Sequence, residues 1–419
     1  MVTTTLYELG DARFGGRMRV SKSPLGRRGW FPCGPLRRLF VFRRPHSERA
    51  EARIKSRWMD RDDDALFAWA SEAAARTWTG SRVDKASTLR GDLSARRFFR
   101  VGLAGSPESP STAILVDLGP HDLPAYVRTL RLLDTAPAEP PWIEVNGFLH
   151  SLGVPVPKLF AAGVAERALL VEDVGDTPLF DVAGATPAHA GDLYRLAVEE
   201  LLRIHVDGTR SLPPGFIASK IAYDERLFFW ELKEFIELGF NAVVARHNVS
   251  IVEPELRALA KQLGGLPRVL SHRDYHGWNL LVQTVDGRAR VRVIDFQDAL
   301  MAPGAQDLAV LLTTRDTHRV VTPALERRLL DFYLAGLARR GEQSLSTTVF
   351  DRSYRLCVLQ HALKMLGRFL WFESNGRPGY ARYVPDCLGQ AQRMLATELG
   401  AGFPQLRESL HGASLKAPA

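Results

Sequence analysis

Cysteine is scarce in this sequence. The 419 residues include three cysteines, Cys33, Cys357 and Cys387, which lie far apart. This number and spacing give neither a disulfide framework nor a zinc site, so a reducing cytoplasm is the compartment we expect.

Long apolar runs are also missing. No stretch approaches the roughly 20 residues that span a bilayer, so we expect no transmembrane segment and no membrane partner.

Positive charge is in excess, but only at one end of the chain. The net charge is +8, from 55 Lys and Arg against 47 Asp and Glu. Residues 1–60 hold 14 Lys and Arg and 5 Asp and Glu, a difference of +9, so the remaining residues sum to −1. A protein that tracks nucleic-acid phosphates needs clustered positive charge on its folded part. We therefore expect no nucleic-acid partner.

Residues 1–58 differ in pattern from the rest of the chain. Arginine pairs alternate with Gly and Pro, and no helical or strand period persists. The apolar run Leu39–Phe42 is too short for the core of a signal peptide. Such a segment buries too little apolar surface to offset its ordering entropy, so we expect a disordered or untranslated extension. A chain that begins at Met59 should keep full activity and stability.

Residues 59–178 have the pattern of a small sheet with a helix packed on it. Apolar spacing is helical over 66–78 and 142–152. The strand-like runs are 97–101, 113–116, 156–160 and 168–171.

From residue 179 to 400 the apolar period is mainly helical, and residues 401–419 are left as a tail. The helical segments are 189–205, 223–246, 253–264, 323–340, 347–374 and 384–398, interrupted by short strands at 269–270 and 291–294. A sheet lobe followed by a helical lobe, with polar loops where they meet, is an α+β fold with two lobes.

Two polar clusters follow the short strands of the helical part. The first, SHRDYHGWN, contains His272, Asp274 and Asn279, and the second, VIDFQD, contains Asp295. Phosphoryl transfer from a nucleotide needs one carboxylate that orients the acceptor hydroxyl and takes its proton. It also needs a second carboxylate and an amide oxygen that hold magnesium on the phosphates. We therefore predict that Asp274 is the catalytic base and that Asn279 and Asp295 are the metal ligands.

The same residues have two other interpretations. His272, Asp274 and His276 alternate along an extended loop and could bind a metal, but the sequence holds no further His or Cys cluster to complete the ligand shell. Alternatively, Asp274 and Asp295 could simply cap helices or turns. Capping would explain either acid alone. It does not readily explain why both motifs occur together, each after an apolar strand and with the spacing found in kinases.

The motif of His272, Arg273, Asp274 and Asn279, together with residues 294–298, resembles the aminoglycoside phosphotransferase family. These are small-molecule kinases on the protein-kinase-like fold. The resemblance implies ATP as phosphoryl donor, Mg²⁺ as cofactor, and His272 with Asp274 at the catalytic position. In protein kinases a long activation loop follows the second motif. Here a helical run begins at Asp307, which leaves no space for that loop, so we expect a small-molecule substrate.

Other segments are similar to the anomeric kinases of N-acetylmuramate and N-acetylglucosamine in bacterial cell-wall recycling. They are residues 91–100, 223–235, 295–299 and 360–369. This resemblance covers about residues 60–400 and implies phosphorylation of an amino sugar at its C1 hydroxyl. Two rivals remain. One is a kinase for an aminoglycoside, a choline-like molecule or another alcohol, and the other is a pseudokinase that binds nucleotide without catalysis.

The expected nucleotide contacts come from two places in the sheet lobe. The polar turn with Gly91, Asp92 and Ser94 should cover the phosphates, as the resemblance implies. Glu172 and Val174 lie where the two lobes should join, so their backbone is expected to hydrogen-bond the adenine.

The lysine with which typical family members grip the phosphates is missing. Strand residues 113–117 contain no lysine, although Glu144 stands where such a lysine usually finds its carboxylate partner. A guanidinium can grip phosphate with two hydrogen bonds, so Arg96, Arg97 or Arg100 could replace the lysine. Because side chains alternate along a strand, Arg97 and Arg100 cannot both face the nucleotide. Solvated edge charges are the alternative for each of these arginines.

Asp224 and Glu231 are the acids that we expect in the acceptor pocket. They lie on a helix that should border the site, and carboxylates suit sugar hydroxyls. Two acids seven residues apart also describe an ordinary solvated helix face, so both interpretations stay open. The sequence fixes neither the oligomeric state nor the choice between ATP and GTP.

Overall fold

The computed structural model describes residues 63–89, 96–120, 123–135, 137–244, 249–342 and 346–414, all within one compact unit. The expectations for residues 1–58 and for Gly91, Asp92 and Ser94 lie outside the described residues. Within this part of the chain, no helix is both long enough and apolar enough to cross a membrane.

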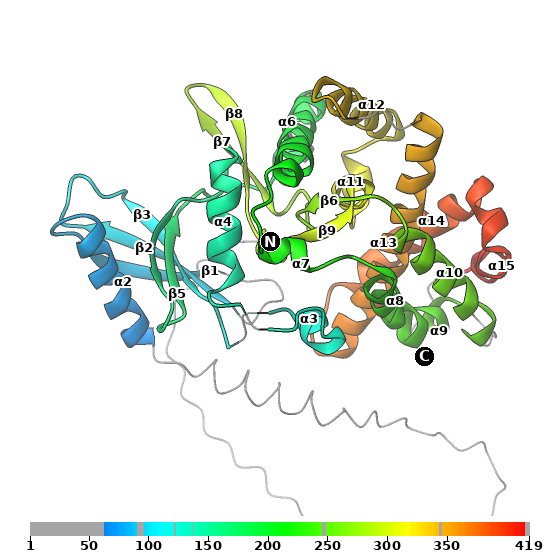
Figure 1. The fold of residues 1–419 in the computed structure, drawn as a ribbon, viewed down its shortest axis with the longest axis horizontal. Coiled ribbons are helices and arrows are strands. Elements are labelled where there is room, and N and C mark those ends of the chain that lie inside the picture. The colour runs from blue at the N-terminus through cyan, green and yellow to red at the C-terminus, as the bar shows by residue number, and fades with distance from the viewer. Residues whose placement is uncertain are drawn as a thin grey trace, which may run out of the picture. The chain divides into compact units, whose positions relative to one another are not determined.

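A five-stranded antiparallel sheet forms the first part of the fold (Figure 1). In spatial order its strands are β1 (Arg82–Leu89), β2 (Arg97–Ala104), β3 (Thr112–Asp117), β5 (Ala168–Glu172) and β4 (Leu159–Gly163). Strand β1 was not recognised as a separate run in the sequence. It is an edge strand with mostly exposed residues, so it lacks the alternation of buried and exposed positions that marks a half-buried strand.

Two helices cover the two faces of this sheet (Figure 1). Helix α2 (Asp63–Thr77) packs on one face, where its Trp69 shares a small core with Phe99 and Leu115. Helix α4 (Pro141–Ser151) lies on the other face and buries Val145 and Leu149 in the main core. Alternate residues of β2 therefore point to different helices, because successive side chains of a strand lie on opposite faces of the sheet.

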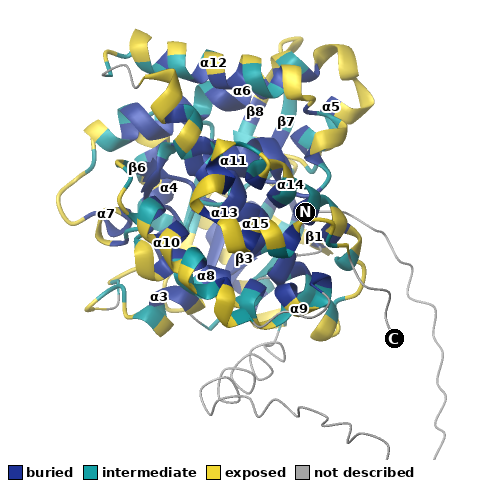
Figure 2. Cartoon of the chain, turned by 90° about the vertical axis from the view of Figure 1, so that its right-hand side faces the viewer, coloured by how far each residue is buried: buried dark blue, intermediate teal, exposed yellow. Residues whose placement is uncertain are grey.

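The helical part surrounds one long buried helix, α13 (Thr347–Ser374). The other long helices are α6 (Ala190–Leu202), α8 (Glu225–Glu234), α10 (Glu253–Gly264), α11 (Gly304–Thr313), α12 (Pro323–Arg339) and α14 (Val384–Leu395). The shorter ones are α3 (Ala125–Leu130), α5 (Leu179–Ala185), α7 (Ile217–Lys220), α9 (Phe240–Val243) and α15 (Pro404–Leu410). Helix α12 is exposed on its outer side and buried on its inner side (Figure 2). The α+β architecture with a sheet lobe and a helical lobe is thus confirmed.

The helix expected over 223–246 is interrupted in the structure. After α8 the chain makes a π-helical turn, Phe235–Gly239, before α9 begins. This turn packs against α13 at Gly367, where a Cβ would lie only 2.3 Å from the backbone nitrogen of Phe235. The two backbones approach too closely for any side chain larger than hydrogen, which gives a structural reason for glycine at this position.

The last described residues do not form a separate tail. Helix α15 lies within the segment that was separated as residues 401–419, and its Leu406 and Leu410 are buried in the main core. The boundary drawn at residue 400 therefore does not mark the end of the packed helical part.

Candidate active site

Two small antiparallel sheets bring the two polar clusters together. Strand β6 (Arg268–Ser271) pairs with β9 (Leu300–Pro303), and β7 (Leu280–Val285) pairs with β8 (Arg288–Val293). The first cluster follows β6 and the second follows β8. At the end of the β7–β8 pair, the backbone N–H of Ile294 donates to the carbonyl of Asn279 at 3.0 Å. This bond places Asp295 next to Asn279, although 16 residues separate them in the sequence.

The three residues predicted to perform phosphoryl transfer meet at this point. The side-chain amide of Asn279 donates to the backbone carbonyl of Asp274 at 3.0 Å. The same nitrogen lies 3.4 Å from a carboxylate oxygen of Asp295. The structure therefore brings Asp274, Asn279 and Asp295 into one site.

Asp307 holds the backbone of the first cluster. Its carboxylate accepts the N–H groups of His272 and Arg273, at 2.8 and 2.9 Å. It also lies 3.0 Å from Nε2 of the buried His205, whose Nδ1 contacts the hydroxyl of Tyr333 at 2.8 Å. Burial raises the pKa of Asp307, but the hydrogen bond from His205 helps to outweigh it and the pKa is lowered. Asp307 therefore acts as a carboxylate brace for this loop.

His272 connects the two clusters to each other. Its side chain is buried, and Nε2 lies 3.0 Å from the backbone carbonyl oxygen of Ile294. The sequence placed His272 at the catalytic position together with Asp274. In the structure its ring contacts backbone rather than an open site, so we assign it to positioning.

Asp274 remains accessible, with 37% of its side chain exposed. Partial burial raises its pKa, but the charges of Arg273 and Lys364 outweigh this effect and lower the pKa to about 2. Asp274 is therefore ionised at neutral pH and can accept a hydrogen bond from a hydroxyl group.

Arg273 lies among three acids, Asp274, Asp298 and Glu231. Its guanidinium donates to Glu231 at 3.0 Å and lies 3.7 Å from Asp274 and 3.8 Å from Asp298. The group also stacks over the ring of Tyr126, with the guanidinium carbon 4.0 Å from the ring centroid. Arg273 thereby links the site to the buried core of the helical part.

Glu231 is buried among four donors. Lys364 lies 2.9 Å away, the side-chain amide of Gln360 donates at 3.2 Å, and Tyr223 donates through its hydroxyl. Arg273 is the fourth donor. Burial raises the pKa of Glu231, but these charges and hydrogen bonds lower it to about 2. Tyr223, Gln360 and Lys364 lie in segments that resemble the amino-sugar kinases, and here these three residues form a single buried cluster.

The two acids expected in the acceptor pocket therefore have other partners. Glu231 is enclosed by this cluster and does not form part of a solvated helix face. Asp224 is the N-cap of α8, where its carboxylate accepts from the backbone N–H of Leu227 at 3.0 Å and from Arg226 at 2.9 Å. Neither acid presents an unengaged carboxylate in this arrangement. No local pattern around Glu231 indicates these contacts, because its partners Gln360 and Lys364 lie on a distant segment.

The donor atoms next to Asp274 fit a magnesium ion. Asp295 has 44% of its side chain exposed, and the amide nitrogen of Asn279 is engaged, which leaves its amide oxygen for a ligand. Magnesium prefers such hard oxygen ligands and usually takes a few from the protein and the rest from phosphates and water. Across the described residues, no group of three or more His, Cys, Asp or Glu could hold a metal by itself. Phosphate oxygens would therefore be needed.

The three arginines of the sheet lobe have different neighbours. Arg96 approaches Asp295 at 3.3 Å and Asp298 at 3.9 Å. Arg97 points to the α2 side and pairs with Asp63 at 2.6 Å and with the buried Asp117. Arg100 points to the opposite side from Arg97 and pairs with Asp173 and Asp176 near the junction of the lobes, as the alternation along β2 requires.

The guanidinium of Arg292 joins the two lobes. Glu172, at the end of β5, pairs with Arg292 of β8 at 2.6 Å. Burial raises the pKa of Glu172, but the hydrogen bonds from Arg292 and from the backbone of Lys158 lower it. The next residue but one, Val174, is buried, and no backbone–backbone hydrogen bond joins it to another described residue.

Among the described residues, no lysine forms an ion pair with Glu144. Its carboxylate accepts the backbone N–H of Ile217 at 3.2 Å and links α4 to α7. Strand β3 itself carries no lysine. Glu144 lies on the helix that the sequence predicts, but its carboxylate contacts the backbone of Ile217 instead of a lysine.

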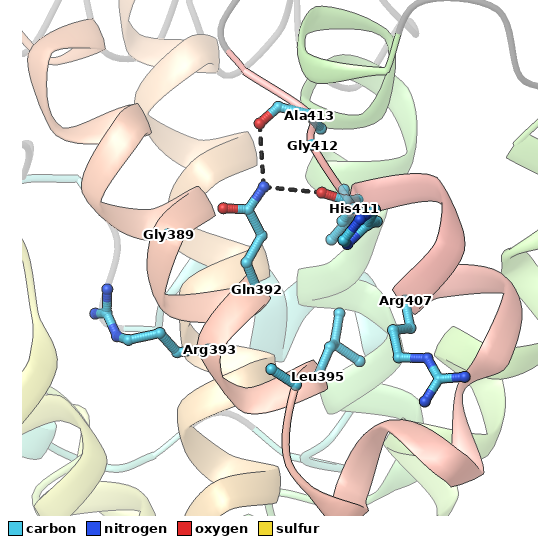
Figure 3. A pocket seen from close by; sticks show the side chains of 10 residues that line it. Gly389, Gln392, Arg393, Leu395, Arg407, His411, Gly412 and Ala413 are labelled. Carbon is cyan, nitrogen blue, oxygen red and sulfur yellow. Dashed lines mark hydrogen bonds between the residues drawn. The ribbon is translucent and has the colours of Figure 1, made fainter.

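A cavity of about 630 Å³ lies elsewhere, between α14 and α15 (Figure 3). Its lining includes Gln392, Arg393, Arg407 and His411. None of the residues predicted for phosphoryl transfer lines it, so we do not assign the substrate to this cavity.

The family model described as the phosphotransferase enzyme family (APH) matches residues 85–343. An N-acetylmuramate/N-acetylglucosamine kinase of Caulobacter vibrioides is 32% identical over 257 residues, which are 58% of this chain and 67% of that protein. A protein of the same name from Pseudomonas aeruginosa is 30% identical over 306 residues, 67% of this chain and 84% of that one.

Two solved structures share the fold. A choline kinase of Cryptosporidium parvum has a TM-score of 0.51 at 13% identity, over 84% of this chain and 100% of that one. A microcompartment-associated aminopropanol kinase has a TM-score of 0.53 at 14% identity, over 81% and 99%. At such identities the likeness concerns the fold alone, which is that of small-molecule kinases. The family match and the two bacterial relatives show that the chain belongs to the phosphotransferase enzyme family and transfers a phosphoryl group to a small-molecule alcohol.

Proposed function

We propose that this protein is a magnesium- and ATP-dependent kinase for the anomeric hydroxyl of N-acetylmuramate or N-acetylglucosamine. The observation that carries the proposal is the meeting of Asp274, Asn279 and Asp295 in one site, with Asp274 ionised and accessible. The choice of an amino sugar rests on the names of the two bacterial relatives. It is supported by Tyr223, Gln360 and Lys364, which lie in the segments that resemble those enzymes.

Asp274 orients the acceptor and takes its proton. The hydroxyl oxygen attacks the γ-phosphorus, the bond from phosphorus to the oxygen of ADP breaks, and the hydroxyl proton passes to Asp274. A carboxylate with a pKa of about 2 is a weak base, so it mainly orients the hydroxyl while the proton leaves late. This suits phosphoryl transfer, whose loose transition state gains most from positioning and charge neutralisation.

Asn279 and Asp295 would hold magnesium, which would neutralise charge on the phosphates. The brace from Asp307 and the contact of His272 with Ile294 keep these side chains in register, because both fix the backbone that carries them. The backbone of Val174 is the proposed contact of the adenine.

The second candidate acceptor is another small alcohol, such as an aminoglycoside or a choline-like molecule. The shared fold of choline and aminopropanol kinases is compatible with it, but their identity to this chain is too low to indicate a substrate. A nucleotide-binding pseudokinase is the third candidate. The presence of Asp274, Asn279 and Asp295 in one site argues against it.

The test is an ADP-release assay with both amino sugars, an aminoglycoside and choline. We expect turnover with the amino sugars and none with the methyl glycoside of N-acetylglucosamine, whose anomeric hydroxyl is blocked. Asp274→Asn should lower kcat more than 100-fold, since general-base and positioning groups contribute about 10²–10⁴-fold. Silence with both amino sugars, or equal turnover with the methyl glycoside, would refute the acceptor. Magnesium-dependent stabilisation by ATP without ADP release from any acceptor would favour the pseudokinase.

A further inference from the structure

Arg96 lies between the sheet lobe and the loop that carries Asp295. It immediately precedes β2, and its guanidinium is 3.3 Å from Asp295 and 3.9 Å from Asp298. We infer that Arg96 binds the phosphates of the nucleotide in place of the lysine that β3 lacks, and that it rests on Asp295 and Asp298 when no nucleotide is bound. This inference depends on the proposed function, because it assigns a residue to the nucleotide site of that reaction.

The other two arginines of this region are already committed to the protein. Arg97 donates to Asp63 at 2.6 Å and to Asp117 at 2.9 Å, and Asp117 is completely buried. Removing Arg97 would take the opposite charge away from this buried carboxylate, which is costly. The bond from Arg97 to Asp117 therefore ties β2 to β3 and does not point to the active site.

Arg100 is held in a similar way. Its guanidinium makes two hydrogen bonds to Asp173, at 2.7 and 3.1 Å, and one to Asp176 at 3.1 Å. A bidentate pair of this kind has good geometry on both sides, and an approaching phosphate would have to compete with two carboxylates. Its partners belong to the junction of the lobes, so the structure gives Arg100 a role there.

Arg96 differs from both in what it touches. Its contacts to Asp295 and Asp298, at 3.3 and 3.9 Å, are longer than the shortest bonds of Arg97 and Arg100, and Asp295 is the acid that magnesium would need. A magnesium nucleotide held by Asp295 would weaken the ion pair between Asp295 and Arg96 and would bring phosphate oxygens beside this arginine. A guanidinium has five N–H donors in a planar fork, so it can exchange a carboxylate for a phosphate without moving far.

The charge of the site supports this exchange. Arg96 and Arg273 both approach Asp298, at 3.9 and 3.8 Å. Burial raises the pKa of Asp298, the charges of Arg96 and Arg273 oppose this, and the negative charges of Asp295 and Asp274 add to the rise. Phosphates add further negative charge at the same place. Arg96 brings a positive charge from the start of β2 to Asp295 and Asp298, where these phosphates would arrive.

The experiment is calorimetric titration of Arg96→Ala with ADP and with adenosine. We expect ADP to bind about 10- to 100-fold more weakly than to the wild type, since charged hydrogen bonds contribute about 1.5–3 kcal/mol. Adenosine, which has no phosphate, should bind within twofold of the wild type. Arg96→Lys should recover part of the ADP affinity, because it restores the charge but not the planar fork.

The matched control is Arg327→Ala, which removes an arginine with two carboxylate partners, Asp331 and Asp351, on α12 and α13. Its affinity for ADP should equal that of the wild type. The inference is overturned if Arg96→Ala binds ADP normally, if it loses ADP and adenosine equally, or if Arg97→Ala shows the selective loss instead. In each case the wild type can still phosphorylate the amino sugar, so the proposed function survives. If the wild type binds no nucleotide, the proposed function fails as well.

Discussion

Replacing Glu231 by glutamine tests the role that the structure gives to this acid. The substitution keeps the shape of the side chain but removes its charge, while Arg273 and Lys364 stay buried beside it. The amide nitrogen of glutamine would also face donors. If Glu231 contacted the sugar, the variant should show a higher KM and normal stability. If it holds the buried cluster together, the variant should be less stable.

The magnitude follows from two estimates that agree. The pKa of Glu231 is about 2, against an ordinary value of 4.5, and 1.36 kcal/mol per pKa unit gives about 3 kcal/mol. Breaking a buried ion pair by removing one partner costs about 3–5 kcal/mol. For a folded unit of about 350 residues, an unfolding entropy of roughly 2.1 cal/mol/K per residue converts 3–5 kcal/mol into a Tm lower by about 4–7 °C.

The pH dependence has a definite sign. Because the folded pKa is lowered, the ionised carboxylate stabilises the protein above pH 4.5, and this stability is lost as the pH falls through 2. The difference in Tm between the wild type and Glu231→Gln should therefore be constant from pH 8 to pH 5 and should shrink below that.

The control lies three residues further along the same helix. Glu234 pairs with Arg368, but burial raises its pKa, so its charged form is disfavoured in the folded protein. Glu234→Gln should leave the Tm unchanged or raise it, because the substitution removes a charge that burial disfavours in the folded protein. Thermal unfolding of both variants, with KM for the sugar, decides the matter. Equal small shifts in Tm together with a raised KM for Glu231→Gln would refute the reasoning.

Three further changes have expected outcomes. Asp295→Asn should lower kcat more than 100-fold. It should leave the Tm within about 2 °C of the wild type, because the side chain of Asp295 is 44% exposed. Steady-state kinetics and thermal unfolding test both outcomes, and a turnover above a hundredth of wild type would contradict the prediction. Burial raises the pKa of Glu200 to about 7, so the wild type loses stability as the pH rises from 4.5 through 7. Glu200→Gln should therefore raise the Tm at pH 8 by about 2–4 °C and have no effect on the Tm at pH 4. An equal change in Tm at both pH values would argue against this explanation. Gly367→Ala should cost at least 1–3 kcal/mol, because its Cβ meets the backbone nitrogen of Phe235 at 2.3 Å, whereas Gly147→Ala on α4, with open space around it, should be neutral or stabilising in the same unfolding measurement.

The sequence predicts best those elements whose signals are local. Helices α10 and α13 have the expected bounds, because their apolar spacing is regular and Ser346 caps the start of α13. The meeting of Asp274, Asn279 and Asp295 could also be predicted, since their spacing is fixed by the strands that precede them, whereas their catalytic roles remain a prediction. The opposite directions of Arg97 and Arg100 follow from strand alternation alone.

Features that depend on distant partners could not be predicted. Strands β7 and β9 are short, and each is defined by pairing with a partner strand rather than by its own pattern. Glu231 has the sequence context of a solvated acid, but it is buried because Gln360 and Lys364 arrive from a helix about 130 residues away. Nothing within the 223–235 segment indicates those contacts.

The guanidinium of Arg292 has a consequence for motion. Besides Glu172, it donates to Gln283 and to the backbone carbonyls of Pro155 and Val156, so all five of its N–H groups are engaged. These partners come from both lobes, so a rotation that opened the junction would break several charged hydrogen bonds at once. Any opening that admits the nucleotide should therefore pivot about this point and be widest at the strands farthest from it. Loosening the pivot would change how fast substrates enter and products leave before it changed the chemistry.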